Sequence, residues 1–252
     1  MNLVISGWPG GGTTTLSIIL SYALKLKLYR GSSTFRLLGE KLRFGDTGKD
    51  RIDADNELEP VFGPIYDRYN KYVLENRDNI LVETDYHIAD RKKNPKIVSY
   101  FLCTSVSVRA SRLSIDSRGK DVDVIQERDA LLKQKYMELF GIDWFDKRDL
   151  KRQYNALIDN DEATISEELE VIYRDLMKKG YISVDQYKIL VMNMNDLESL
   201  FWGNGKQHFL DLLDKDNLLY KGEEILKEIN QLFSTEILNM PTNIKEAILS
   251  FA

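Results

Sequence analysis

The sequence predicts an α/β fold in which a mainly parallel sheet lies between two layers of helices. Short apolar runs typical of buried strands alternate along the chain with longer segments of helical periodicity, as expected for β-α-β units. Their right-handed crossovers place helices on both faces of the sheet. The chain has 252 residues, of which 43% are apolar, so it is long enough to bury the core that such a fold needs.

The predicted elements follow one another in the expected order. A strand at 3–6 leads into a glycine-rich turn at 7–12 and then into a helix at 13–26, whose apolar residues recur every three or four positions. Further strands are predicted at 79–83, 97–103 and 154–158, and further helices at 34–42, 61–75, 105–113, 122–139 and 166–179. Thr164, three residues before Glu167, indicates a capping box at the start of the last of these helices.

The pattern changes after about residue 180. Strand signals nearly vanish there, apart from one at 187–191, and helices are predicted at 195–202, 206–214, 221–235 and 242–251. We therefore divide the chain into a nucleotide-binding domain at 1–180 and a helical C-terminal extension at 181–252. Two roles stay open for this extension: a cap packed on the core, or a module that binds a protein partner or a second copy of the chain.

Composition narrows the classes of function. The net charge of −5 argues against broad, nonspecific adhesion to nucleic acid, which requires a basic face. No apolar stretch approaches the roughly 18 residues of a membrane-spanning helix, and no signal peptide is visible. The single cysteine, Cys103, excludes an internal disulfide and is typical of a reducing cytosol. We therefore expect a cytoplasmic protein without a nucleic-acid or membrane partner.

The strongest functional signal is the glycine-rich turn, which reads Gly7-Trp8-Pro9-Gly10-Gly11-Gly12-Thr13-Thr14-Thr15. Its spacing matches the P-loop, G-x-x-x-x-G-K-S/T, and it lies between a predicted strand and a predicted helix. Glycines let backbone N–H groups approach phosphate oxygens, and the positive end of the helix adds to the attraction. We therefore expect Gly7, the glycines at 10–12 and the threonines at 13–15 to hold the phosphates of a nucleoside triphosphate.

Two positions of this loop have particular meaning. The hydroxyl of Thr14 stands where P-loop proteins bind Mg²⁺. Thr13 stands where they carry a lysine that reaches the β- and γ-phosphates. Without that lysine, the loop alone indicates phosphate binding more firmly than it indicates catalysis.

Several stretches together resemble one family. After the loop comes a Ser/Gly-rich run that ends in Phe35-Arg36. A predicted helix with Arg109 and Arg112 is followed by a loop containing Arg118, by a helix that begins its motif at Arg128, and by Phe140-Gly141-Ile142-Asp143. The late strand Leu157-Ile158-Asp159-Asn160 completes the pattern. Over roughly residues 1–175 the chain resembles nucleoside monophosphate kinases, and specifically the archaeal-type cytidylate kinases, in which Gly-Thr-Thr-Thr is a known form of the loop.

The resemblance implies the three-layer sandwich of the P-loop NTPases, here with a C-terminal helical appendage. It also implies ATP- and Mg²⁺-dependent phosphoryl transfer to a nucleoside monophosphate, most closely CMP or dCMP, with Arg36 holding the acceptor phosphate. One departure concerns the acceptor, because the family usually has Glu-Gly-Arg after the strand at 79–83, where this chain has Glu83-Thr84-Asp85.

Phosphoryl transfer asks the protein mainly for positioning and positive charge. Arg112, Arg118 and Arg128 lie on a predicted helix end, a loop and the next helix, which suits a lid that neutralises the transferring group and excludes water. Solvated helix arginines are the alternative interpretation. Glu83 and Asp85 end a strand at the edge where parallel sheets bind ligands, so they are candidates for orienting Mg²⁺ or binding the acceptor, or for a plain salt bridge.

Two other functions stay open. A P-loop kinase of another small metabolite would keep the loop and the lid but change the acceptor residues. A nucleotide-binding module without turnover would act through its helical tail, which the missing loop lysine favours and the lid arginines oppose.

Overall fold

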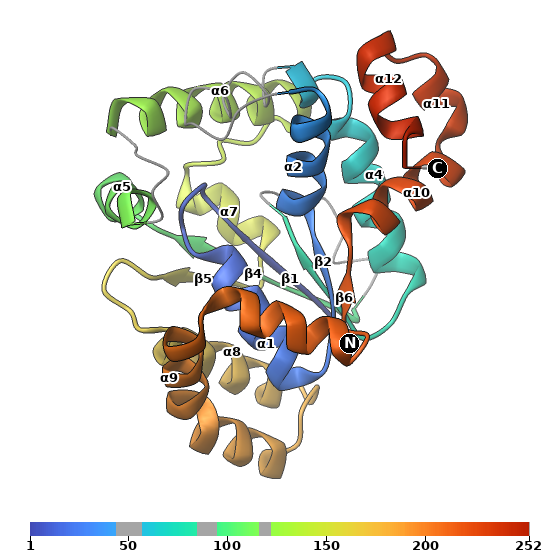
Figure 1. The fold of residues 1–252 in the computed structure, drawn as a ribbon. Helices are drawn as coiled ribbons and strands as arrows, with labels where there is room; N and C mark the ends of the chain where they lie inside the picture. Colours follow the sequence, from blue (N-terminus) through green and yellow to red (C-terminus); the bar gives the residue numbers. More distant parts are fainter. Residues whose placement is uncertain (44–56, 85–94, 116–121, 252) are drawn as a thin grey trace.

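The structure, a computed structural model, describes residues 1–43, 57–84, 95–115 and 122–251. Within these residues, six parallel strands form one sheet in the order β5-β4-β1-β3-β2-β6 (Figure 1). The strands are β1 Asn2–Gly7, β2 Lys27–Arg30, β3 Ile80–Glu83, β4 Ile97–Cys103, β5 Ala156–Asp159 and β6 Leu219–Tyr220. The predicted fold class, a parallel α/β sheet flanked by helices with further helices at the C-terminus, is confirmed.

Helices lie between most of the successive strands, as the sequence predicts, and several of these connections contain more than one helix. They are α1 Thr13–Leu24, α2 Gly31–Lys41, α4 Gly63–Asn76, α5 Val106–Ile115, α6 Val122–Phe140, α7 Lys147–Gln153, α8 Ile165–Lys178, α9 Val184–Lys215, α10 Gly222–Leu232, α11 Ser234–Leu238 and α12 Thr242–Leu249. Thr164 and Glu167 form the expected capping box of α8. None of the helices described is both long enough and apolar enough to cross a membrane.

The sheet separates two hydrophobic cores. Leu3 and Ile5 of β1 point into a core formed with α1, α8 and α9, whereas Val4 between them points into a core formed with α4, α10 and α12. Successive side chains of a strand point to opposite faces, so a short apolar run serves both cores at once. Because all the strand pairs are parallel, the carboxyl ends of the strands lie at the same edge of the sheet.

The predicted strand at 187–191 is wrong, because these residues lie inside the long helix α9. Ser183 caps this helix, and its Oγ accepts a hydrogen bond from the backbone N–H of Gln186 at 3.1 Å. Tyr187 and Leu190 pack on the core, while Ile189 is 59% exposed. The apolar side chains of this run therefore point to different sides of a helix instead of alternating between the two faces of a sheet.

The C-terminal extension adds to both faces of the sheet and to the sheet itself. Its strand β6 pairs in parallel with β2, α9 packs on α1 and α8, and α10 and α12 pack on α2 (Figure 1). Glu228 of α10 accepts hydrogen bonds from the hydroxyls of Tyr69 at 2.6 Å and Tyr220 at 2.9 Å and forms an ion pair with Arg77. A partner for these helices stays a prediction.

Candidate functional site

The glycine-rich loop follows β1 at the carboxyl edge of the sheet, where ligands bind in open α/β folds. Gly10 and Gly12 have positive φ angles of 85° and 95°, which side chains rarely tolerate. A Cβ atom on Gly11 would lie 2.9 Å from both Thr104 Oγ1 and the carbonyl oxygen of Trp8. The loop therefore requires glycine for its turn and for its close packing.

Helix α1 begins at this loop, and neither a capping side chain nor an acidic residue of its own occupies its first turn. Its N-cap residue is Gly12, which has no side chain to accept from the first-turn N–H groups, and its first turn carries no acidic residue. The first N–H groups of a helix have no intrahelical acceptor, so an anion at this position is stabilised by them and by the helix dipole. The threonines at 13–15 lie in this turn, as expected for residues that hold phosphates.

Two side chains hold the backbone of the loop through hydrogen bonds. The carbonyl oxygen of Gly11 accepts hydrogen bonds from Asn160 Nδ2 at 2.7 Å and from Arg112 NH1 at 3.1 Å. Arg112 NH2 also donates to the carbonyl oxygen of Asn160 at 2.7 Å. Thr104 joins this group through a hydrogen bond to the Asn160 side chain. Arg112 therefore lies at the loop, and in this structure it positions the backbone of the loop.

Arg109 lies on the same helix as Arg112 and also contacts the loop. Its guanidinium, 1% exposed, forms a paired salt bridge with Asp129 of α6 and donates to the carbonyl oxygen of Pro9 at 3.3 Å. It also lies 5.8 Å from the ring centroid of Trp8, whose indole N–H donates to the carbonyl oxygen of Trp144 at 3.0 Å. The loop is thus tied to α5 and α6, the two helices on either side of the predicted lid.

A chain of polar contacts leads from the loop to the next strand ends. The Thr14 hydroxyl donates a hydrogen bond to the carboxylate of Glu83, which is 4% exposed at the end of β3. The other carboxylate oxygen of Glu83 pairs with Arg30 Nε at 3.3 Å, at the end of β2. Hydroxyl and carboxylate oxygens are the hard donors that Mg²⁺ prefers, and Mg²⁺ usually adds waters and substrate phosphates to one or two such protein groups. Thr14 and Glu83 therefore fit a magnesium ion chemically.

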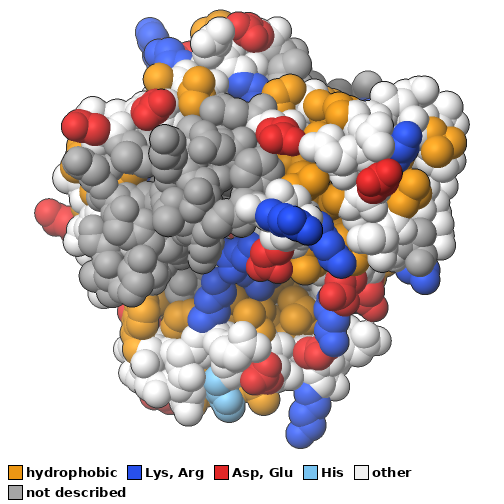
Figure 2. Space-filling view, turned by 45° about the horizontal axis from the view of Figure 1, so that its top comes forward, with side chains coloured by type: hydrophobic (Ala, Val, Ile, Leu, Met, Phe, Trp, Pro, Cys, Tyr) orange, Lys and Arg blue, Asp and Glu red, His pale blue; other side chains and the backbone are white. Residues whose placement is uncertain are grey.

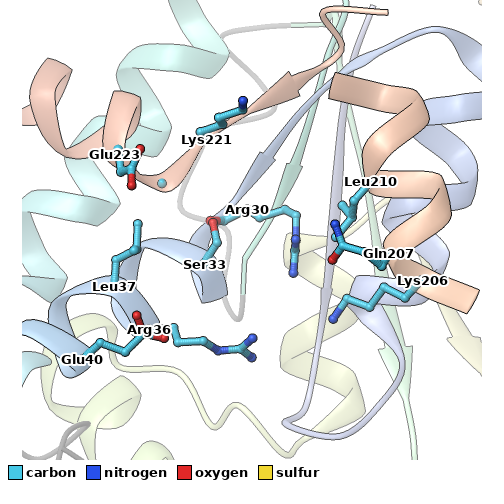
Figure 3. Close-up of a pocket in the computed structure, with 11 residues that line it drawn as sticks. Arg30, Ser33, Arg36, Leu37, Glu40, Lys206, Gln207, Leu210, Lys221 and Glu223 are labelled. Carbon is cyan, nitrogen blue, oxygen red and sulfur yellow. The ribbon is translucent and has the colours of Figure 1, made fainter. Parts of the chain in front are cut away.

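A pocket of about 540 Å³ lies beyond this contact chain (Figure 3). Its lining comes from the end of β2, from α2, from α9 and from the start of α10. The residues are Arg30, Ser33, Arg36, Leu37, Glu40, Lys206, Gln207, Leu210, Lys221, Gly222 and Glu223. Arg36, predicted to hold the acceptor phosphate, points into this pocket together with Arg30, Lys206 and Gln207 (Figure 3).

The lining of the pocket carries more positive than negative side chains: Arg30, Arg36, Lys206 and Lys221 against Glu40 and Glu223. Figure 2 shows lysine and arginine side chains near the middle of one face, with acidic side chains among them and hydrophobic side chains beside them. An opening with such a lining attracts anions, because clustered positive charge raises their local concentration.

Arg128 lies on α6 and is half-buried. Asp85 and Arg118 fall outside the described residues. Three residues of the site were not predicted from the sequence: Arg30, Asn160 and Lys206. Arg30 and Asn160 each directly follow or end a strand, and that position at the carboxyl edge is the one signal that would have indicated them.

A parallel α/β sheet with such a loop at its carboxyl edge is typical of proteins that bind nucleotide phosphates. No known protein-family model matches the chain. The chain is 28% identical over 193 residues to the cytidylate kinase of Archaeoglobus fulgidus, covering 74% of this chain and 99% of that protein. It is 24% identical over 180 residues to the cytidylate kinase of Methanosarcina acetivorans, covering 68% of this chain and 94% of that protein.

Among solved structures, an uncharacterized protein from Eubacterium ventriosum aligns with a TM-score of 0.49 at 17% identity, over 71% of this chain and 98% of that one. The chain is thus similar, at low identity, to proteins named cytidylate kinase, and this similarity supports phosphoryl transfer of the kinase type. The particular relatives are archaeal cytidylate kinases, and their identity to this chain is low.

Proposed function

We propose that this protein transfers the γ-phosphoryl group of ATP, with Mg²⁺, to a nucleoside monophosphate, and that CMP and dCMP are its preferred acceptors. One observation carries the proposal: the contacts from Thr14 through Glu83 to Arg30 join the phosphate loop to the basic pocket that contains Arg36. Two phosphate-binding places thus adjoin each other, as transfer between two phosphorylated molecules requires. The similarity to curated cytidylate kinases supports the choice of acceptor.

On the donor side, the backbone of the loop and the first turn of α1 hold the phosphates of ATP. Asn160 and Arg112 each donate a hydrogen bond to the carbonyl oxygen of Gly11, which keeps this oxygen turned away from the ligand. Thr14 and Glu83 hold Mg²⁺, which when bound neutralises charge on the donor phosphates. Such preorganised dipoles stabilise developing charge without reorganising during the reaction.

On the acceptor side, Arg36 and Arg30 bind the phosphate of the monophosphate. A guanidinium matches two phosphate oxygens at once, which fixes the orientation of the nucleophilic oxygen as well as its position. A volume of about 540 Å³ is within the usual range for small-molecule sites. Of the two carboxylates that the sequence offered for the acceptor, Glu83 is assigned to Mg²⁺, so Asp85 is the candidate for contact with the rest of the acceptor.

Arg112, Arg118 and Arg128 are the candidates for stabilising the transferring group. Arg112 already contacts the loop, so a small shift of its guanidinium would bring it from a backbone carbonyl to a phosphate oxygen. A second candidate function, phosphorylation of another small metabolite, is favoured by Thr84-Asp85 in place of the Gly-Arg that follows the glutamate in the resembling family.

The test is a coupled assay of ATP consumption with Mg²⁺ against CMP, dCMP, UMP, AMP, GMP, dTMP and no acceptor. Turnover confined to CMP and dCMP is the expected result. Turnover with none of these acceptors, while ATP still binds, contradicts the proposal. A metabolite kinase or a binding module without turnover would then account for the loop.

A further inference from the structure

The C-terminal extension forms one wall of the basic pocket. Lys206, Gln207 and Leu210 come from α9, and Lys221, Gly222 and Glu223 are the N-cap and the first two residues of α10. The opposite wall comes from α2 and the end of β2 (Figure 3). The pairing of β6 with β2 brings these two distant parts of the chain together around the pocket.

A glycine places Lys206 at this wall. Gly205 has φ 79° and ψ 169°, a conformation that is essentially restricted to glycine, and it breaks α9 into two helical segments. Lys206 and Gln207 are the first residues after the break, and the second segment continues to pack on the core through Phe209. The break thus turns these two side chains toward the pocket, while the rest of the helix stays packed.

The charges in the pocket are unevenly distributed. Figure 3 shows the charged ends of Arg30, Arg36 and Lys206 pointing toward one another, with the amide of Gln207 beside them. Lys221 and Glu223 lie at the other end of the pocket, and Lys221 pairs with Asp214 at 2.8 Å. These three cations outnumber the two carboxylates near them, which are Glu83, paired with Arg30 at 3.3 Å, and Glu40 in the lining. A net positive end suits a phosphomonoester, which carries a charge of about −1.5 to −2 near neutral pH.

We propose that Lys206 and Gln207 of the C-terminal extension complete the binding site for the acceptor phosphate. This inference rests on the proposed function, because it assigns the pocket to the acceptor monophosphate. Lys206 binds a phosphate oxygen together with Arg36, and the Gln207 amide donates to a second oxygen or to the sugar. The extension is then part of the substrate site, and its packing on β2 is a condition for acceptor binding.

The experiment compares steady-state kinetics of the full chain with those of Lys206→Met, Lys206→Arg and Lys215→Met. Lys215 lies on the same helix, is exposed and is not in the pocket, so Lys215→Met is the matched control for loss of one charge. Lys206→Met is expected to raise the KM for CMP about tenfold or more, which corresponds to about 1.4 kcal/mol, and to leave the KM for ATP unchanged. Lys206→Arg should recover most of the affinity, and Lys215→Met should behave as the wild type.

An unchanged KM for CMP in Lys206→Met overturns the inference and leaves the proposed function standing. A lowered kcat with an unchanged KM for CMP also overturns it, because Lys206 would then act on the transferring group. If the wild type phosphorylates no monophosphate, the proposed function fails, and calorimetric titration with CMP decides about the pocket. Binding that Lys206→Met weakens and Lys215→Met preserves supports a phosphomonoester site, and equal or absent binding in all variants overturns it.

Discussion

The two halves of the candidate site are built in different ways. The half proposed for the donor is local in sequence: one strand, one loop and the first turn of one helix supply the backbone at 7–15 that is proposed to bind phosphates. The acceptor half is assembled from α2 and from a segment around 206–223 that reaches it through the pairing of β6 with β2. A local half keeps a recognisable pattern of residues, whereas an assembled half depends on the whole fold.

The two halves should also differ in the substitutions that they tolerate. The donor half needs glycine at fixed backbone angles and allows little substitution, while the acceptor half presents long, flexible cations that can adapt to different acceptors. Changes in the donor half should therefore affect every acceptor alike. Changes in the acceptor half should alter which acceptor is used and how tightly it is bound.

The largest effect is expected from Thr14→Val, which keeps the shape of the side chain and removes its hydroxyl. We expect kcat to fall by about 100-fold or more, or roughly 3 kcal/mol, because the ligand for Mg²⁺ and the partner of Glu83 are lost together. Thr14→Ser retains the hydroxyl and should keep most of the activity. Equal losses in Thr14→Val and Thr14→Ser would mean that the hydroxyl is not the important group.

Arg36→Met should produce the next largest effect and should confine it to the acceptor. The KM for CMP is expected to rise by about 30-fold, roughly 2 kcal/mol, with the KM for ATP unchanged. Steady-state kinetics with each substrate varied in turn measure this split. An equal rise in the KM for ATP would mean that Arg36 also affects donor binding, which contradicts the division of the site into two halves.

The contrast between local parts and parts assembled by the whole fold also explains which elements could be predicted from the sequence. Strand β4 was predicted with the bounds that it has, because a continuous apolar run is typical of a strand buried on both faces. Strand β2 was not predicted, since only Leu28 and Tyr29 are apolar in it and its form depends on pairing with β3 and β6. The strand predicted at 187–191 failed because Ser183 starts a helix there.

The site follows the same rule. The loop was predicted because glycine spacing before a helix has a direct physical meaning. Asn160 and Lys206 carry no such pattern, and they join the site only when β5 and α9 are placed beside the loop and α2. Arg36 was found through resemblance to a family and Glu83 through its place at the end of a predicted strand. The structure adds that Arg30 pairs with Glu83 and lines the pocket together with Arg36.

A smaller effect is expected from Gly12→Ala, which tests the backbone of the donor half. A side chain at a φ of 95° is strained whatever the space around it, so we expect about tenfold weaker ATP binding by calorimetry. Gly39→Ala is the matched control, because Gly39 lies inside α2 and a Cβ atom there meets nothing within 4 Å. The control should be unchanged in ATP binding and slightly more stable, by about 0.5–1 kcal/mol.

The smallest effect on catalysis, and a distinct one on stability, is expected at Glu168, behind the donor half. Burial raises the pKa of this carboxyl to about 7, although its hydrogen bond with Asn160 and the charge of Arg112 oppose the rise. The folded state therefore binds this proton more tightly than the unfolded state, and the free energy of unfolding falls as the pH rises from about 4.5 to about 7.

Glu168→Gln removes that pH dependence and should stabilise the protein at pH 8 by up to about 3 kcal/mol, with no gain below pH 4.5. Urea unfolding across this pH range measures it. Glu162→Gln, at an exposed position just before α8, should leave the pH dependence as it is. A Glu168→Gln profile parallel to the wild type would show that this carboxyl stays ionised in the fold.

The most direct test of the central claim follows the phosphoryl group itself. Phosphorus NMR of a reaction containing the protein, ATP, Mg²⁺ and CMP distinguishes transfer to the acceptor from hydrolysis. The proposed function predicts that CDP and ADP form in equal amounts, with little free phosphate, and that neither forms when Mg²⁺ is chelated. Release of inorganic phosphate without CDP, or no reaction while ATP binds, would contradict it.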